Sequence, residues 1–184
     1  EYMQSRVEEQ PRDFQAHLQL GIVLFREQQY EQTLTHLRQA QQILPTYSGY
    51  PSPSMVMAQV YDAMGNEDAR LEQLRVMLEN QQHDANTPLI LANHALESRN
   101  LDQAKYYIDR ALAVNPYQPE VQRRLADFAN ASDDTSLAVQ AFEVLMALEV
   151  SDPVGARTDL ASAYLANSQQ AEAKETVLRA LEQA

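Results

Sequence analysis

The sequence predicts an all-α fold built from a repeated pair of helices, and three observations lead to this prediction. The 184 residues include only four glycines, whereas alanine, leucine, glutamine and glutamate are abundant, a composition that favours helix over sheet. Apolar residues recur at spacings of three and four, which places them on one face of a helix. The pattern as a whole recurs about every 34 residues, which indicates an array of similar helical units.

The clearest copy of the unit ends with the segment LDQAKYYIDRALAVNP at residues 101–116. Ala104, Ile108 and Ala111 share one helix face, and the Asn-Pro pair at the end of the segment stops the helix. The upstream segment LANHA, residues 91–95, opens the preceding helix with its own apolar stripe. Together the two segments predict a helix–turn–helix unit.

Four further copies follow the same pattern along the chain. The repeats are predicted near residues 14–50, 51–84, 85–118, 119–153 and 154–184. Each first helix carries one small residue where it must approach its partner closely; these residues are Gly21, Ala58, Ala92, Ala126 and Ala161. Pro11 lies 34 residues before Pro45, so residues 1–13 are predicted to be the end of a preceding repeat or an N-terminal helix.

This unit resembles the tetratricopeptide repeat (TPR), which has a large-small pair in its first helix and alanine-x-x-x-aromatic spacing in its second. The resemblance covers residues 14–184, although Thr33 and Arg70 stand where the family usually has alanine. It implies an all-α, right-handed α-α superhelix (a TPR solenoid) of about five repeats plus an N-terminal helical segment. The ends show no polar capping helix, so we expect the chain to be part of a longer array or protein.

The segment LPTYSGYPSPSM, residues 44–55, joins the first and second predicted repeats. It lengthens that interval to 37 residues, and the pattern continues in register beyond it, so it is interpreted as an extended turn and not a domain boundary. Long surface turns cost little free energy, so the insertion can simply be tolerated. Alternatively, Tyr47 and Tyr50 provide exposed aromatic contacts for a partner.

The formal net charge of −12 disfavours nucleic acid and anionic lipid as partners. It favours neutral or basic protein segments over acidic ones, although the same charge also serves solubility. No apolar run is long enough to insert into a membrane. The chain is therefore expected to be soluble, and cytoplasm and periplasm both remain compatible with it.

The sequence provides no arrangement of side chains that indicates catalysis, so we expect no enzymatic activity, no metal and no cofactor. No two of the four histidines share the helical spacing of a metal site, and there is no glycine-rich phosphate loop. His17 falls where the family places a packing aromatic, which predicts a partly buried structural role.

The resemblance also implies a binding surface, because the first helices of TPR proteins line a concave groove. The second, fifth, ninth and twelfth places of each repeat face inward, and the candidates for peptide binding are Leu18, Ile22, Phe25, Met55, Gln59, Asp62, Leu89, Asn93, Arg123, Asp127 and Asn130. The apolar members fit hydrophobic side chains, and Asn93 can bond a peptide backbone. Two alternatives stay open. One is that a preceding helix covers the apolar end of this groove, and the other is that Arg123 and Asp127 simply pair with each other.

We therefore expect a protein-interaction scaffold or adaptor that binds a peptide segment or partner protein, most naturally on the concave face. One alternative is a regulatory or substrate-presenting module of a larger enzyme or of a bacterial envelope or secretion assembly. Another is self-association through the ends of the array. The family's carboxylate clamp is absent, because Leu18 and Ile22 occupy its lysine and asparagine places.

Overall fold

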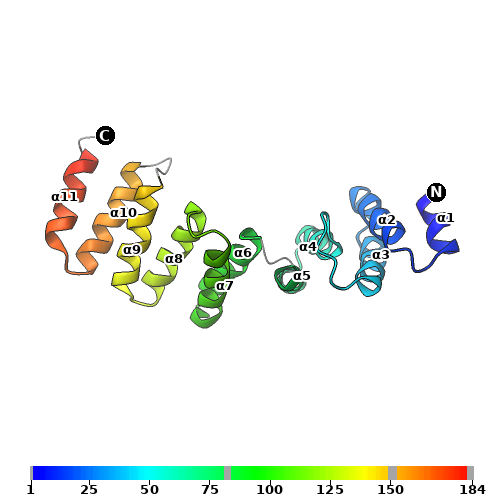
Figure 1. The fold of residues 1–184 in the computed structure, drawn as a ribbon. Helices are drawn as coiled ribbons and strands as arrows, with labels where there is room; N and C mark the ends of the chain where they lie inside the picture. Colours follow the sequence, from blue (N-terminus) through cyan, green and yellow to red (C-terminus); the bar gives the residue numbers. More distant parts are fainter. Residues whose placement is uncertain (1, 81–83, 149–152, 182–184) are drawn as a thin grey trace. The chain divides into compact units, whose positions relative to one another are not determined.

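The computed structural model describes residues 2–80, 84–148 and 153–181, and these residues form eleven α-helices and no strand (Figure 1). This confirms the predicted all-α helical repeat fold. The helices are α1 (Tyr2–Glu9), α2 (Phe14–Arg26), α3 (Tyr30–Ile43), α4 (Pro53–Ala63), α5 (Glu67–Asn80), α6 (Asn86–Glu97), α7 (Leu101–Val114), α8 (Pro119–Ala131), α9 (Thr135–Ala147), α10 (Pro153–Ala166) and α11 (Gln170–Leu181).

The chain divides into two compact units, Glu1–Gln82 and His83–Ala184. In the first unit, α2 pairs with α3 and α4 with α5, while α1 packs on α2 and α3 packs on α4. In the second unit the pairs are α6 with α7, α8 with α9 and α10 with α11, and α7–α8 and α9–α10 contacts join them. The division falls next to Ala85, where the sequence predicts the start of the third repeat.

The turn inside each helix pair has the same backbone conformation in all five pairs. One residue in each turn has a positive φ, between 55° and 69°, and these residues are Gln28, Gly65, Arg99, Asp133 and Ser168. In each case the following N–H donates to the carbonyl five residues earlier, for example Gln29 N to Leu24 O and Asn100 N to Ala95 O. This is the Schellman arrangement, which satisfies carbonyls left open at a helix end.

In three of these turns, the residue after the positive-φ position is also the N-cap of the next helix. The side-chain oxygens of Asn66, Asn100 and Asp134 accept from backbone N–H groups three residues on, at 3.0–3.2 Å. Such caps satisfy N–H groups that have no partner within the helix. Three residues between the helices therefore end one helix and begin the next, which holds the pair antiparallel.

Each unit has its own buried apolar cluster. In the first unit the cluster comprises Leu18, Leu34, Leu37, Ala40, Val56, Met57, Val60 and Tyr61. In the second unit the larger cluster comprises Ala126, Ala129, Ala138, Val139, Ala141, Phe142, Leu145, Leu160 and Ala163. Small side chains recur in the second cluster, as the close approach of paired helices requires.

Gly21 shows how close that approach is. A Cβ on this residue would lie 2.7 Å from Leu37 Cδ2 and 2.8 Å from Leu37 Cγ. Leu37 has no exposed surface, so it has little room to move away. Gly21 is therefore small because α2 packs directly on α3, as the sequence predicts.

The extended turn between α3 and α4 has one packed and one exposed tyrosine. The Tyr47 ring contacts Phe14, with centroids 4.6 Å apart, whereas Tyr50 is 83% exposed. Gly49 lies against the Tyr47 ring, where a Cβ would come within 2.3 Å of the hydroxyl oxygen. Tyr47 thus anchors the turn to α2, and Tyr50 is the aromatic side chain available to a partner.

Candidate functional site

The eleven candidate residues fall on two units. Six lie on α2 and α4 in the first unit, and five lie on α6 and α8 in the second. Within each unit the two helices concerned contact one another, α2 with α4 and α6 with α8. The candidates can therefore form one surface patch on each unit, and each patch is described separately.

Leu18 does not belong to the surface of the first unit. Its side chain is 2% exposed and lies in the cluster with residues of α3 and α4, such as Leu34 and Val56. The prediction that Leu18 is available to a ligand is therefore corrected. Neighbours on α3 and α4, and not a preceding helix, supply the rest of the cluster that buries it.

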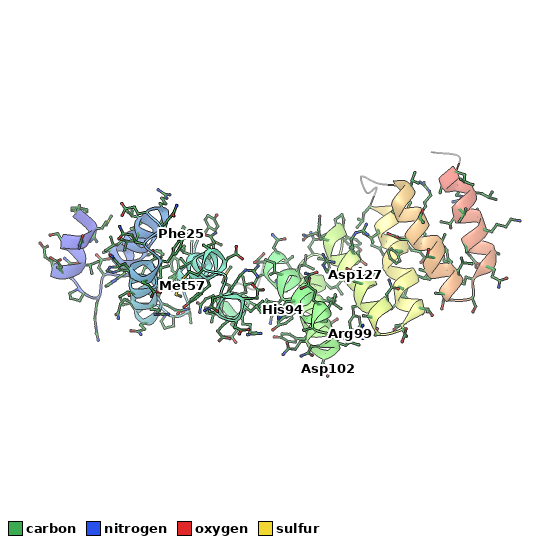
Figure 2. All side chains as sticks on the ribbon, turned by 180° about the vertical axis from the view of Figure 1, so that it is seen from behind. Phe25, Met57, His94, Arg99, Asp102 and Asp127 are labelled. Carbon is green, nitrogen blue, oxygen red and sulfur yellow. The ribbon has the colours of Figure 1, made fainter. Side chains whose placement is uncertain are left out.

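The other five candidates of the first unit remain accessible to different degrees. Ile22 and Phe25 are half-buried at the edge of the apolar cluster, and Met55 is half-buried on α4. Figure 2 shows the Phe25 side chain on this unit, and its ring contacts Tyr30 at a centroid distance of 6.2 Å. We name Ile22, Phe25, Met55, Gln59 and Asp62 the α2–α4 patch.

The polar end of the α2–α4 patch is formed by Gln59 and Asp62, which are both exposed. Asp62 pairs with Arg70 Nε at 3.2 Å, and Arg70 is also held by Glu67 at 2.8 Å. Because Arg70 keeps a second carboxylate, a ligand can compete for Asp62 without leaving this arginine unpaired. The patch thus runs from an apolar edge to an accessible carboxylate.

Leu89, in the second unit, also requires a correction. Its side chain is 9% exposed and packs with Ala111 and Val121. Like Leu18, it serves the core and offers little surface to a ligand. The accessible candidates of this unit are Asn93, Arg123, Asp127 and Asn130, which we name the α6–α8 patch.

Several polar groups of the α6–α8 patch already have protein partners. Asn93 is half-buried, and its Nδ2 donates to Glu97 Oε1 at 2.7 Å. The amide oxygen of Asn93 has no such bond among the described residues, so it keeps an acceptor for a peptide N–H. Asn130 is exposed near the end of α8.

Arg123 and Asp127 do not pair with each other. Arg123 Nη1 lies 3.5 Å from Asp159 Oδ2 on α10, and Asp127 pairs with Arg124. Helical spacing brings two partners within reach of Asp127, and the three-residue pair with Arg124 is the one formed. Arg123 instead links α8 to α10, so its charge is shared with a neighbouring helix pair.

Sequence reasoning missed a pair of histidines in the first unit. His17 Nδ1 on α2 lies 3.2 Å from His36 Nδ1 on α3, and His17 Nε2 lies 3.1 Å from the carbonyl oxygen of Pro11. His17 is 5% exposed, which agrees with its predicted structural role. The two histidines are 19 residues apart, so a search for helical spacing within one helix could not find them. Aligning the two predicted helices of the first repeat as an antiparallel pair could have brought them together.

These contacts limit where the protons of the pair lie. A carbonyl only accepts, so His17 Nε2 carries a proton, and of the two facing Nδ1 atoms one donates and the other accepts. Burial and the nearby charge of His17 lower the pKa of His36.

The described residues contain no group of three or more metal-ligating side chains. Among the same residues, no helix combines the length and apolar character needed to cross a membrane.

The paired helices, their shared turn and the contacts between first helices define an all-α helical repeat protein. No family model and no curated protein sequence matches the chain. Solved structures do match it. YrrB, described as a TPR protein with an unusual peptide-binding site, aligns with a TM-score of 0.71 and 14% identity, over 99% of this chain and 92% of YrrB.

Two further structures are similar. MamA aligns with a TM-score of 0.68 and 16% identity, over 92% of this chain and 90% of MamA. A tetratricopeptide repeat protein from Parabacteroides merdae aligns with a TM-score of 0.58 and 13% identity, over 98% of this chain and 70% of that protein. At these identities the similarity is one of fold, and the fold of this chain is that of tetratricopeptide repeat proteins.

Proposed function

We propose that the chain is a protein-interaction scaffold that binds a peptide segment or partner protein on its first helices. The observation that carries this proposal is the α2–α4 patch, where Ile22, Phe25 and Met55 stay half-exposed beside Gln59 and Asp62. A surface that changes from apolar to acidic over two neighbouring helices suits a segment with one hydrophobic anchor and one basic residue. The peptide-binding site ascribed to YrrB gives independent support.

The net charge of the chain supports a partner that is neutral or basic. The chain has twenty-six acidic residues and fourteen basic ones. Most arginines with described contacts are held by carboxylates of this chain, such as Arg70, Arg75 and Arg179. A basic segment would be attracted at long range and would find Asp62 accessible. This attraction should weaken as salt increases.

The test is site-specific photo-crosslinking in cells of the source organism. A photoreactive amino acid replaces Gln59, which is exposed on the patch, or Glu72, which is exposed on the second helix α5. We expect the photoreactive residue at position 59 to crosslink a defined protein that the one at position 72 does not crosslink. Identical products from both positions, or none from Gln59, would contradict binding at this patch.

Self-association is a second candidate, and one observation favours it. On α11 the side chains of Val177, Leu178 and Leu181 are exposed, and exposed apolar side chains gathered on one helix often mark a contact surface. Light scattering of the chain and of a Leu178→Glu variant tests this function. A monomer at high concentration in both cases would exclude it.

A further inference from the structure

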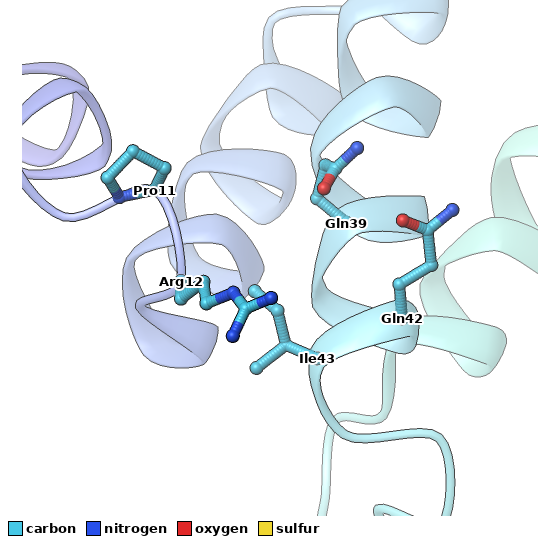
Figure 3. Close-up of a pocket in the computed structure, with 5 residues that line it drawn as sticks. All are labelled: Pro11, Arg12, Gln39, Gln42 and Ile43. Carbon is cyan, nitrogen blue, oxygen red and sulfur yellow. The ribbon is translucent and has the colours of Figure 1, made fainter.

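The structure contains an open pocket in the first unit that none of the candidate groove residues lines. Its volume is about 470 Å³, and it is lined by Pro11, Arg12, Gln39, Gln42 and Ile43. Pro11 and Arg12 belong to the turn between α1 and α2, and the other three lie on α3. Figure 3 shows Arg12 reaching from the turn toward Ile43, with Gln39 and Gln42 along the same side of α3.

The polar groups of this pocket are available to a ligand. Within the described residues, Arg12 and the carboxamides of Gln39 and Gln42 have no hydrogen bond or ion pair to another protein group. This sets Arg12 apart from Arg6, Arg70 and Arg124, which are each held by a carboxylate. The pocket therefore presents an unpaired guanidinium beside two free amide groups.

The acidic residue next in sequence does not compete for Arg12, because Asp13 is already engaged. Asp13 Oδ2 accepts from Arg6 Nε at 2.6 Å, and Asp13 Oδ1 accepts from the N–H of Ala16 at 2.9 Å. The Ala16 hydrogen bond is the main cause that lowers the pKa of Asp13. Asp13 therefore stays ionised, but both of its oxygens face other donors.

The turn that carries Arg12 is held in place before any ligand arrives. Asp13 N donates to Gln10 O at 2.9 Å, and the buried His17 binds the carbonyl oxygen of Pro11 at 3.1 Å. Together with the Arg6–Asp13 ion pair, these contacts connect the turn to α1 and α2. A fixed backbone lowers the entropy cost of binding, which leaves chiefly the Arg12 side chain to be ordered.

We propose that this pocket binds the C-terminal carboxylate of a partner polypeptide whose last residue is apolar. A guanidinium binds a carboxylate through two parallel hydrogen bonds, and Gln39 and Gln42 carry both the donors and the acceptors that the preceding peptide bond needs. Ile43 and Pro11 give the last side chain an apolar wall. A volume of about 470 Å³ is within the usual range for small ligands.

This site is separate from the α2–α4 patch, so the two proposals stand or fall independently. It is also compatible with a basic partner, because any polypeptide with a free C-terminus carries one carboxylate there whatever its net charge.

The experiment titrates the isotope-labelled chain with acetyl-Ala-Leu as the free acid and as the amide, and follows backbone amide shifts by NMR. We expect the free acid to shift Arg12, Gln39 and Ile43 saturably, and the amide to bind at least about tenfold more weakly, because a charged hydrogen-bonded pair is lost. Arg12→Gln should weaken free-acid binding by a similar factor. Arg26→Gln, at an exposed arginine on α2 of the same unit, is the matched control and should leave it unchanged.

Equal binding of acid and amide would overturn the proposal, as would equal losses in the Arg12 and Arg26 variants. A third probe, acetyl-Ala-Glu amide, carries its carboxylate on a side chain. If it binds as tightly as the free acid, the commitment to a chain terminus is wrong. A Gln39→Ala, Gln42→Ala double variant should weaken the free acid severalfold, and unchanged binding would contradict the role of the carboxamides.

Discussion

Gly21 is the residue at which helix preference and packing oppose each other most directly. Alanine favours a helix interior by about 1 kcal/mol over glycine, but a methyl group here would meet Leu37 at 2.7 Å. Overpacking in a filled core costs about 1–3 kcal/mol. We expect Gly21→Ala to lower the free energy of unfolding by about 1 kcal/mol in urea denaturation.

The control for this prediction removes the obstacle. Leu37→Ala alone should cost about 2–5 kcal/mol because it leaves a cavity. In that background the methyl group at position 21 has space, so Gly21→Ala should become neutral or stabilising. If its effect is the same in both backgrounds, contact with Leu37 is not the cause.

The His17–His36 pair predicts a pH dependence for the first unit. The folded-state pKa of His36 lies below its usual value of 6.5, because of burial first and of the charge on His17 second. The folded state therefore binds fewer protons than the unfolded state, so stability present above pH 6.5 is lost as pH falls toward the lowered pKa. His36 is only half-buried, so solvent screening limits the effect to less than about 1 kcal/mol.

Urea midpoints measured between pH 7.5 and pH 5 check this prediction. The parent chain should lose stability over that interval. His36→Gln should flatten the dependence, because glutamine cannot take up a proton. An unchanged pH slope in His36→Gln would assign the dependence to other groups.

At the scale of the helix pair, the shared turn has an energetic consequence. A left-handed backbone costs a residue with a Cβ roughly 1–2 kcal/mol, and four of the five turns place such a residue there. We expect Arg99→Gly to raise the free energy of unfolding by up to about 1 kcal/mol, partly offset by the greater freedom of glycine when unfolded. Gly65→Ala should lower it by about 1 kcal/mol.

The matched control at the same position is Arg99→Ala, which removes the long side chain but keeps the Cβ. It should leave the denaturation midpoint nearly unchanged. If alanine stabilises the chain as much as glycine does, the gain comes from loss of the arginine and not from the backbone conformation.

At the scale of the whole molecule, the two units each have their own core. Leu37 and Leu145 are almost completely buried, one in each cluster. Truncation to alanine should cost about 2–5 kcal/mol at either site. Because contacts in repeat arrays are chiefly between neighbouring repeats, we expect the loss to be largest in the unit that carries the substitution.

Hydrogen exchange resolves this expectation segment by segment. Leu37→Ala should speed exchange most in residues 2–80, and Leu145→Ala most in residues 84–148 and 153–181. Uniform acceleration over the whole chain by either variant would indicate that the two units unfold as one.

Much of the fold could be predicted from the sequence, because its main determinants are local. The helix faces follow from spacings of three and four, and the pairing follows from the 34-residue period. Prolines and capping residues such as Pro45 and Asn100 locate the ends of helices. Even the small residue Gly21 could be assigned to close packing before any contact was known.

The candidate site was predicted less well, since position in a repeat does not determine exposure. Leu18 and Leu89 occupy inward-facing places of the motif but lie in the cores. Ile22 and Phe25, on the same helix as Leu18, remain at the surface. Whether a side chain is covered depends on the bulk of residues on other helices, which the periodicity does not encode.

The sequence therefore sufficed to predict the helices, their pairing and the class of fold. The helix faces rest on residues a few positions apart, and the pairing rests on a pattern that recurs along the chain. The tertiary structure alone decided which partners the polar side chains take. Arg123 pairs with Asp159 and His17 contacts His36, whereas Arg12, beside Gln39 and Gln42, has no partner within the part of the chain that the structure describes. These outcomes depend on distances between atoms on different helices, and small differences in packing decide them.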